Sequence, residues 1–220
     1  MVRKRLSFAE RRSRILGAAA RVFAEHGYAE AAMDRIALAA GVTKPVLYDH
    51  FESKEALFVT VLESVRDKLV AEEEKASALS TSDDNRVRAA VRGYLDVAEA
   101  APDAMGVLAS ARYGDPAGAK LARMVQSSAV AGIAAMLAPP SADGEPWTRL
   151  AAAQFVMSGL HATALWWFEN EGVSKDALAE VAATVAWRGI SAWKANPERR
   201  TSVGLSPLKD GALSETSAPK

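Results

Sequence analysis

The stretch that decides the fold is Met33 to Phe51, MDRIALAAGVTKPVLYDHF. A helix-turn-helix needs a small residue where its helices cross, a glycine in the turn, and apolar residues that hold the second helix at a fixed angle. Ala37 and Gly41 supply the first two. The apolar set follows in order: Ile36, Ala40, Val42, Leu47 and Phe51. The stretch therefore predicts two short helices around Gly41, the second from about Lys44 to His50.

This second helix has an inward and an outward face. Leu47 and Phe51 are four residues apart, so both lie on the inward face. Four residues are left on the outward face: Lys44, Pro45, Tyr48 and Asp49. Thr43 is placed to cap the helix, and Pro45 lies in its first turn, where a missing N–H costs little. A short helix with one free face is therefore expected.

Helices are predicted on both sides of this motif. Residues 8–25 form an amphipathic pattern that Gly27 ends. After the motif, Ser53 is expected to cap a helix that reaches about residue 75. Its apolar residues repeat at helical spacing: Phe58, Leu62, Val65 and Leu69. This fourth helix should join the two halves of the chain.

The remainder also has helical patterns, and its abundant alanine favours helix over sheet. We expect helices near residues 87–98, 103–113, 116–137, 147–169 and 175–193, with loops at 76–85 and 139–146. The predicted fold is all-α. We divide it into a helix-turn-helix domain at 1–53, a second helical domain at 54–195 that begins with a linking helix at 54–75, and a disordered tail at 196–220.

Charge is distributed unevenly although the net charge is zero. Residues 1–60 hold ten Lys and Arg against seven Asp and Glu, which leaves the rest of the chain mildly acidic. Half of the residues are apolar, enough for a buried core. There is no export signal and no apolar run long enough to span a bilayer, so we expect a cytoplasmic protein without membrane contact.

An enzyme is not expected. The absence of cysteine excludes disulfides, thiolate nucleophiles and cysteine-ligated metals. The three histidines, His26, His50 and His161, are far apart, and there is no Gly-rich phosphate loop or nucleophile elbow. The sequence therefore predicts no catalytic residue, no cofactor and no metal. His26 beside Gly27 fits the end of a helix better than a ligand.

With its basic first helix, the run GVTKPVLYDHFESKEALF resembles the N-terminal domain of the tetracycline-repressor (TetR) family. The likeness extends over residues 8–60, and the remainder resembles the family only as a run of helices of suitable length. It implies that residues 44–50 enter the major groove of operator DNA. One departure is Ala31 and Ala32, where the family has a threonine pair, so a hydroxyl cap is missing there.

The resemblance also implies roles for seven residues. Thr43, Tyr48 and Lys54 would contact phosphates, and Lys44 and Pro45 would approach base edges. His50 would bond to a phosphate or a base, and Arg35 would add attraction to the DNA backbone. Taken singly, Tyr48 also fits ordinary packing and Lys54 a solvated charge; it is their joint spacing that favours DNA. The basic residues 3–5 fit a minor-groove arm and a disordered end equally well.

For the second half, the resemblance implies a small-molecule effector and a homodimer formed through the last two helices. An apolar or aromatic effector would meet an apolar pocket with a few polar groups. Candidate lining residues are Tyr94, Met105, Tyr113, Met124, Phe155, Met157, His161, Trp166 and Trp167. The same stripe also fits an ordinary core. One plausible dimer face comprises Leu160, Thr163, Trp167, Val181, Val185 and Arg188.

The function hypothesis is a DNA-binding transcriptional regulator, in its finer form a repressor that a small molecule releases from its operator. Activation instead of repression stays open. The alternative is a helical ligand-binding or adaptor protein that keeps the fold without binding DNA. The basic first helix favours the regulator over the adaptor.

Overall fold

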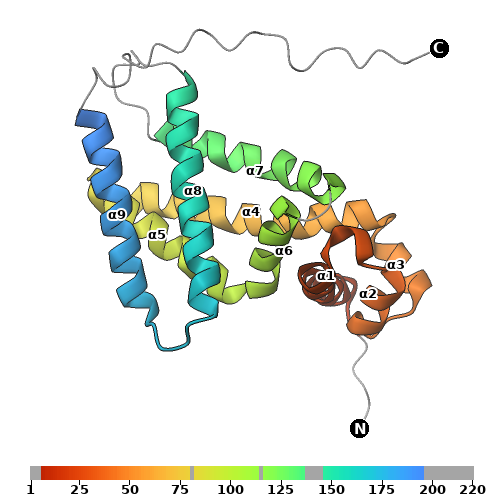
Figure 1. The fold of residues 1–220 in the computed structure, drawn as a ribbon. Coiled ribbons are helices and arrows are strands. Elements are labelled where there is room, and N and C mark those ends of the chain that lie inside the picture. The colour runs from red at the N-terminus through yellow and green to blue at the C-terminus, as the bar shows by residue number, and fades with distance from the viewer. Residues whose placement is uncertain (1–5, 80–81, 114–115, 137–145, 196–220) are drawn as a thin grey trace, which may run out of the picture.

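The computed structural model describes residues 6–79, 82–113, 116–136 and 146–195, and the regular structure within these ranges is helical throughout. The helices are α1 Phe8–Glu30, α2 Met33–Ala40, α3 Lys44–His50, α4 Lys54–Leu79, α5 Asp83–Ala100, α6 Pro102–Tyr113, α7 Pro116–Met136, α8 Pro146–Phe168 and α9 Lys175–Ala195 (Figure 1). The all-α prediction is confirmed. Most of the predicted loop at 139–146 and the predicted tail at 196–220 lie outside the described residues.

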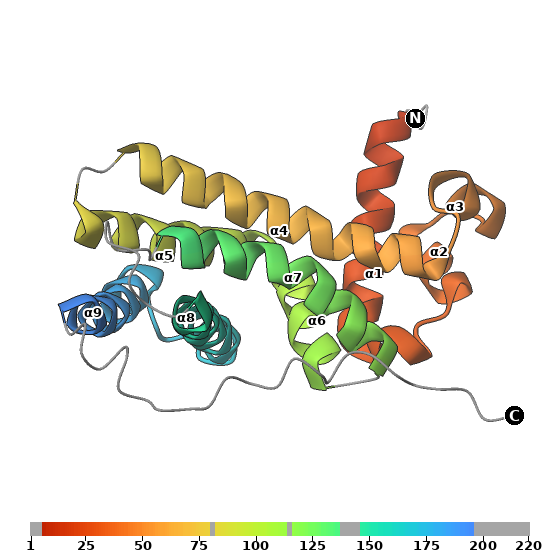
Figure 2. The ribbon, with the colours of Figure 1, turned by 90° about the horizontal axis from the view of Figure 1, so that it is seen from above.

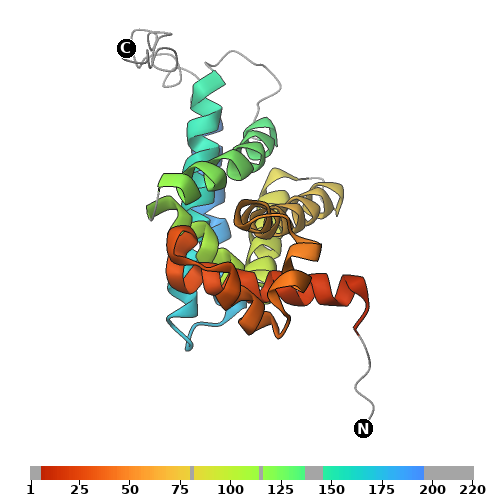
Figure 3. The same cartoon turned by 90° about the vertical axis from the view of Figure 1, so that its right-hand side faces the viewer.

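The helices are arranged in two groups joined by one long element. α1, α2 and α3 lie at one end of the molecule, and α8 and α9 lie side by side at the other (Figures 1 and 2). α4 runs from the first group along most of the molecule, with α5 packed against it. Seen from the end that carries α1 to α3, α1 crosses in front of the other helices (Figure 3).

One large buried core extends through both groups. It includes Ile15 and Phe23 of α1, Leu62 of α4 and Met105 of α6, all essentially inaccessible to solvent. α6 packs against α1, where a Cβ added at Gly106 would lie only 3.3 Å from the Cβ of Ala24. The core therefore crosses the predicted boundary between residues 53 and 54. Within the described residues, no helix combines the length and apolarity that crossing a bilayer requires.

The ends of the helices follow local side-chain chemistry. α1 begins with a capping box, in which Ser7 and Glu10 each bond to the other's backbone N–H. Ser53 caps α4 as predicted, since its Oγ accepts from the N–H of Ala56 at 3.0 Å. The predicted cap at Thr43 is wrong: among the described residues its side chain makes no capping hydrogen bond to α3. The N-cap position of α2 is Ala32, and no side chain caps this helix, as the missing hydroxyl predicted.

Two glycines set the turns of the N-terminal group. Gly27 has φ 72° and ψ 172°, so the helical path predicted to stop there is interrupted, although α1 continues to Glu30. Gly41 has φ 63° and ψ 37°, the left-handed conformation. Its N–H donates to the carbonyl of Leu38, and the N–H of Val42 donates to Ala37, both at 3.0 Å. This Schellman motif ends α2 and turns the chain into α3.

Gly41→Ala should lower the free energy of unfolding by about 1–2 kcal/mol, because an L side chain is disfavoured in the left-handed region. Gly17→Ala is the matched control. Gly17 is an exposed residue within α1, and an added Cβ there meets nothing within 4 Å. This control should stabilise the protein by about 0.5–1 kcal/mol. Urea unfolding measures both, and equal effects of the two substitutions would contradict the assigned turn.

Candidate functional site

The two faces of α3 are separated as the sequence predicted. Leu47 is fully buried and Phe51 nearly so, and both belong to the large core. The outward residues Lys44, Pro45, Tyr48 and Asp49 are all exposed. Tyr48 is 43% exposed, so its side chain is not buried between helices. The helix therefore presents a polar and aromatic face to the surroundings.

An ion pair holds this face to α2. The Lys44 Nζ lies 2.8 Å from Asp34 Oδ1, and both side chains are more than half exposed. The hydrogen bond and charge of Asp34 raise the pKa of Lys44, so its amine stays charged. Exposed ion pairs contribute little to stability, because solvent screens them. The ammonium can therefore exchange Asp34 for another acceptor at small cost.

Thr43 and Arg35, two further predicted contact residues, are also exposed. Thr43 immediately precedes α3, and Arg35 lies in the first turn of α2. Together with Lys44 and Tyr48 they give this surface two cations and two hydroxyl groups. Such groups are suited to phosphate oxygens and base edges.

His50 lies inside the protein, which differs from the expectation that it contacts DNA. Its side chain is 9% exposed, and its ring lies 4.1 Å from that of Phe8 on α1. Within the described ranges its Nδ1 has no hydrogen-bond partner. Burial lowers the pKa of His50, and the charges of Arg11 and Arg12 lower it further. His50, the last residue of α3, faces α1, so its imidazole is neutral and packed against that helix.

Arg12 holds the end of α3. Its Nη1 donates to the backbone carbonyl of His50 at 3.0 Å, and its guanidinium lies over the Phe51 ring, 4.2 Å from the centroid. A seven-residue helix leaves most of its carbonyls without intrahelical partners, so a side-chain donor at this end is valuable. Arg12, one of the cations of the basic first helix, thus positions the end of α3.

Lys54 was expected to contact a phosphate, but in the structure it joins α4 to α1. Its ammonium donates to the carbonyls of Tyr28 and Ala29 at 2.9 and 3.0 Å. It also lies 4.7 Å from the centroid of the Tyr28 ring. Phe58, one turn further along α4, packs on both Phe23 and Tyr28 with centroid distances of 4.9 and 4.8 Å. These five residues form the α1–α4 joint.

A cavity of about 240 Å³ lies in the helical body. Most of its wall is apolar and comes from five helices: Leu69, Val87, Ala90, Val91, Tyr94, Ile133, Val156, Met157, Leu160, Ala186, Trp187 and Ile190. The polar lining residues are Glu73, Ser77, Asp83, Arg86 and Lys194. A cavity with this composition is suited to an apolar molecule held in orientation by a few polar groups.

A second, smaller cavity of about 40 Å³ shares Leu69, Tyr94 and Met157 with the first. His161 lines it, and the Tyr94 hydroxyl lies 3.0 Å from His161 Nδ1. Burial raises the pKa of Tyr94 well above its usual range, so the phenol stays protonated. The predicted residues Tyr94, Met157 and His161 are therefore brought together at cavity walls.

The other predicted effector contacts are not at these walls. Met105 is fully buried in the core and lines neither of the two cavities described above. Phe155 and Trp166 are 81% and 48% exposed. Trp167 is half-buried and donates from Nε1 to the Val173 carbonyl at 2.8 Å. Helical spacing in the sequence did not show which way each of these apolar side chains faces. The side chains of Tyr113 and Met124 lie outside the described residues.

Apart from Tyr94, the sequence did not identify the residues of α4, α5 and α9 in the cavity wall. Leu69 was expected only as part of the apolar stripe of its helix, and Val87 and Trp187 were not singled out. Glu73, Asp83 and Lys194 were also missed, because charged residues near helix ends resemble ordinary surface residues. Only the convergence of α4, α5 and α9 makes them neighbours.

The outer side of α8 and α9 carries an apolar groove. Phe155, Val181 and Val185 are 81%, 63% and 67% exposed, and all three line it. Leu160 and Thr163 of the predicted dimer face also line the groove, whereas Arg188 and Trp167 do not. Large apolar side chains exposed together on one face mark a contact surface rather than a free surface.

A helix-turn-helix with an exposed polar face, joined by a long helix to a helical body with an apolar cavity, is the arrangement expected of a DNA-binding transcriptional regulator. Residues 15–61 match the family model described as bacterial regulatory proteins of the tetR family. The transcriptional activator FasR of Mycolicibacterium smegmatis is 31% identical over 188 residues, which covers 85% of this chain and 86% of the relative. The chain belongs to the TetR family.

Two further likenesses support this assignment. The transcriptional repressor Rv1474c of Mycobacterium tuberculosis is 36% identical over 63 residues, 29% of this chain and 34% of that relative. A TetR-like transcriptional regulator from Rhodococcus sp. RHA1 shares the fold with a TM-score of 0.68 and 26% identity, covering 85% of this chain and 99% of the other. The named relatives are transcriptional regulators, in agreement with the expected absence of enzymatic function.

Lys54→Met should lower the free energy of unfolding by about 1–3 kcal/mol, because two carbonyls lose a charged donor. DNA affinity should fall, while the slope of its logarithm against log salt stays unchanged. Fluorescence anisotropy across a salt series measures this slope, and Lys68→Met, an exposed site on the same helix, is the control. A slope lower by about one would show instead that Lys54 neutralises a phosphate.

His50 makes stability depend on pH. Because its pKa is lower in the folded protein, the unfolded chain takes up a proton first as pH falls. The stabilising contribution of the neutral ring is complete above the unfolded pKa of about 6.5 and is lost below it. Urea unfolding at pH 7.5 and 5.5 should show a smaller loss for His50→Phe than for the wild type. Equal losses in both proteins would contradict the buried neutral ring.

Proposed function

We propose that the protein is a homodimeric regulator that binds a pseudo-palindromic operator and that an apolar small molecule weakens this binding. Residues 1–53 would read DNA, and residues 54–195 would hold the effector and form the dimer. The observation that carries the proposal is the division of α3, whose apolar side is buried while its polar side is exposed. A helix held in this way fits a major groove.

Within the groove, we assign Lys44 and Pro45 to base edges and Thr43 and Tyr48 to phosphates. Lys44 would exchange Asp34 for guanine acceptors or a phosphate, and Pro45 is limited to apolar contact such as a thymine methyl. Arg35, on α2, would add attraction to the backbone. His50 packs inside the protein against Phe8, and the half-exposed Lys54 donates within the α1–α4 joint.

We assign the groove on α8 and α9 to the dimer interface. Burial of Phe155, Val181 and Val185 against a second copy would form a four-helix interface. A two-fold axis would then place two α3 helices for half-sites separated by a helical turn or a multiple of it. One seven-residue helix offers few contacts, so affinity depends on the pair.

The cavity of about 240 Å³ is the proposed effector site. The regulator FadR of Bacillus subtilis shares the fold, with a TM-score of 0.65, 16% identity and coverage of 81% of this chain and 97% of the other. It was solved in complex with stearoyl-CoA, so this arrangement of helices can accommodate a long apolar chain. The apolar wall around Trp187 and Met157 supports an effector of that character.

α4 connects the cavity to the DNA-reading end. Leu69 and Glu73 line the cavity, while Lys54 and Phe58 of the same helix form the joint with α1. A ligand that moves the cavity end of α4 would therefore tilt the joint and change the separation of the two α3 helices. Such coupling requires the ligand to bind the two separations with different affinities.

Activation is a second candidate outcome of the same binding cycle. FasR, the relative that matches over 85% of this chain, is an activator, whereas the repressor Rv1474c matches over only 29%. The sign of regulation depends on where the operator lies relative to the promoter. Ligand-sensitive operator binding is common to both outcomes.

The experiment is anisotropy titration of DNA from upstream of the chain's own gene, with and without apolar ligands, followed by transcription in vitro from the same DNA. The wild type should bind with a steep salt dependence and bind less tightly with ligand. Val185→Lys should disrupt the dimer and lower affinity at least about tenfold, because it places a charge in the apolar groove. Sedimentation measures the oligomeric state of both proteins.

Ala71→Lys is the matched control, since Ala71 is exposed on α4 and lies outside the groove. It should leave both the dimer and operator affinity unchanged. A monomeric wild type, or the absence of salt-sensitive binding to any promoter DNA, would reject the regulator and favour the adaptor. Transcription that falls on protein addition identifies a repressor, and transcription that rises identifies an activator.

A further inference from the structure

The polar residues of the large cavity gather around one carboxylate. Asp83 of α5 forms ion pairs with Arg86 of the same helix and with Lys194 of α9, whose Nζ lies 3.0 Å from Asp83 Oδ2. All three residues line the cavity. Arg86 and Lys194 therefore converge on an anionic group that belongs to the protein itself.

The position of Asp83 adds to this preference for an anion. It is in the first turn of α5, an eighteen-residue helix whose N-terminal N–H groups carry partial positive charge. Arg86 and Lys194 lower the pKa of Asp83, which shows that the site favours the ionised carboxylate. The side chain of Lys194 is only 22% exposed, so solvent screens its charge incompletely.

The α4 side of the cavity contributes one further carboxylate. Glu73 lines the same cavity, and burial together with the charge of Glu74 raises its pKa. Burial thus disfavours the charged form of Glu73, whereas Arg86 and Lys194 lower the pKa of Asp83. The rest of the wall is apolar apart from Ser77 and the Tyr94 hydroxyl. The cavity consequently has one polar part, where Arg86 and Lys194 meet Asp83, and a long apolar remainder.

We propose that the effector is an amphiphile with an apolar body and one anionic end group, and that this group replaces Asp83 as the partner of Arg86 and Lys194. This inference rests on the proposed function, which assigns the cavity to an effector. The apolar body would lie along Val87, Val91 and Trp187. Leu69, Tyr94 and Met157 separate this cavity from the smaller one, and the flexible methionine can yield to a longer chain.

The exchange also suggests how an effector would act on the protein. Asp83 is the group through which Lys194 connects the end of α9 to the start of α5. A ligand anion that paired with both Arg86 and Lys194 would replace their ion pairs with Asp83. The helices would then be joined through the ligand, which gives it different affinities for two arrangements of α5 and α9.

The test is isothermal titration of the full chain with dodecanoate, dodecyl phosphate and dodecanol at fixed ionic strength, because salt screens such contacts. The wild type should bind both anions at least about tenfold more tightly than the alcohol, a difference expected for a charge-assisted contact. Lys194→Gln should abolish most of this preference without changing dodecanol binding. Asp83→Asn should strengthen anion binding, since it removes the internal competitor while keeping a residue that suits a helix start.

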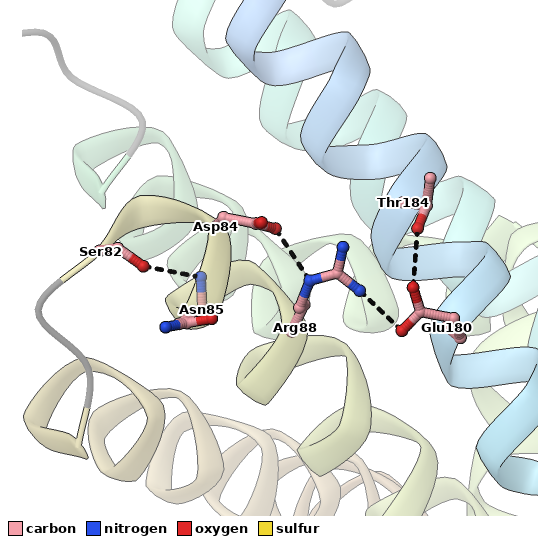
Figure 4. A network of polar contacts seen from close by, with 6 residues as sticks. All are labelled: Ser82, Asp84, Asn85, Arg88, Glu180 and Thr184. Carbon is pink, nitrogen blue, oxygen red and sulfur yellow. Dashed lines mark hydrogen bonds and ion pairs between the residues drawn. The ribbon is translucent and has the colours of Figure 1, made fainter.

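Arg88→Gln is the matched control. Arg88 also connects α5 to α9, because its Nη1 donates to Glu180. Its Nε donates to Asp84 of α5, and this network lies outside the cavity lining (Figure 4). Its loss should leave the preference for anions unchanged. A loss of preference in Arg88→Gln equal to that in Lys194→Gln would overturn the proposal, because helix pairing rather than direct contact would explain both.

The two anionic probes distinguish the source of the end group. Tighter binding of dodecanoate supports a free carboxylate effector, and tighter binding of dodecyl phosphate supports one that carries phosphate. Equal affinity for all three molecules would overturn the anionic end group, while release of operator DNA by dodecanol would leave the proposed function intact. No binding of any probe, together with no effect on DNA, would reject both.

Discussion

The α1–α4 joint is the contact on which the organisation of the molecule depends. The Lys54 ammonium donates to two carbonyls in the last turn of α1, those of Tyr28 and Ala29, and Phe58 packs on Phe23 and Tyr28 one turn further along α4. A charged donor shared by two carbonyls and an aromatic cluster resist both sliding and rotation. α4 is therefore held firmly against α1, although α2 and α3 lie between these two helices in the sequence.

The recognition helix is too short to hold itself in place. Its seven residues are positioned from three sides: Leu47 and Phe51 pack in the core, Arg12 donates to the His50 carbonyl, and Asp34 pairs with Lys44. The first two contacts are buried or half-buried and set the angle of the helix. The third is exposed, so it leaves Lys44 available to an incoming partner. Buried contacts thus fix the helix on its inward side, while the Lys44–Asp34 pair on its exposed side can be exchanged, which suits a surface that reads DNA.

The same helix that forms the joint also reaches the effector cavity. Glu73 and Leu69 lie about four to five turns from Lys54 along α4, so one continuous helix connects the cavity wall to the joint. At the far side of the cavity, Asp83 and Lys194 join α5 to α9, next to the groove that we assign to the dimer. Cavity, joint and dimer face are therefore parts of one connected set of helices.

Much of this architecture follows from the sequence alone. The order of nine helices in the described ranges, the turn at Gly41, the inward Leu47 and Phe51 and the exposed face of α3 all follow from periodicity and backbone preference, which are local properties. Only the tertiary structure decided that His50 faces inward, that Lys54 and Arg12 hold helix ends, that Phe155 lies outside, and that Asp83 meets Lys194. Each of these depends on which distant helix lies opposite, and no local pattern contains that information.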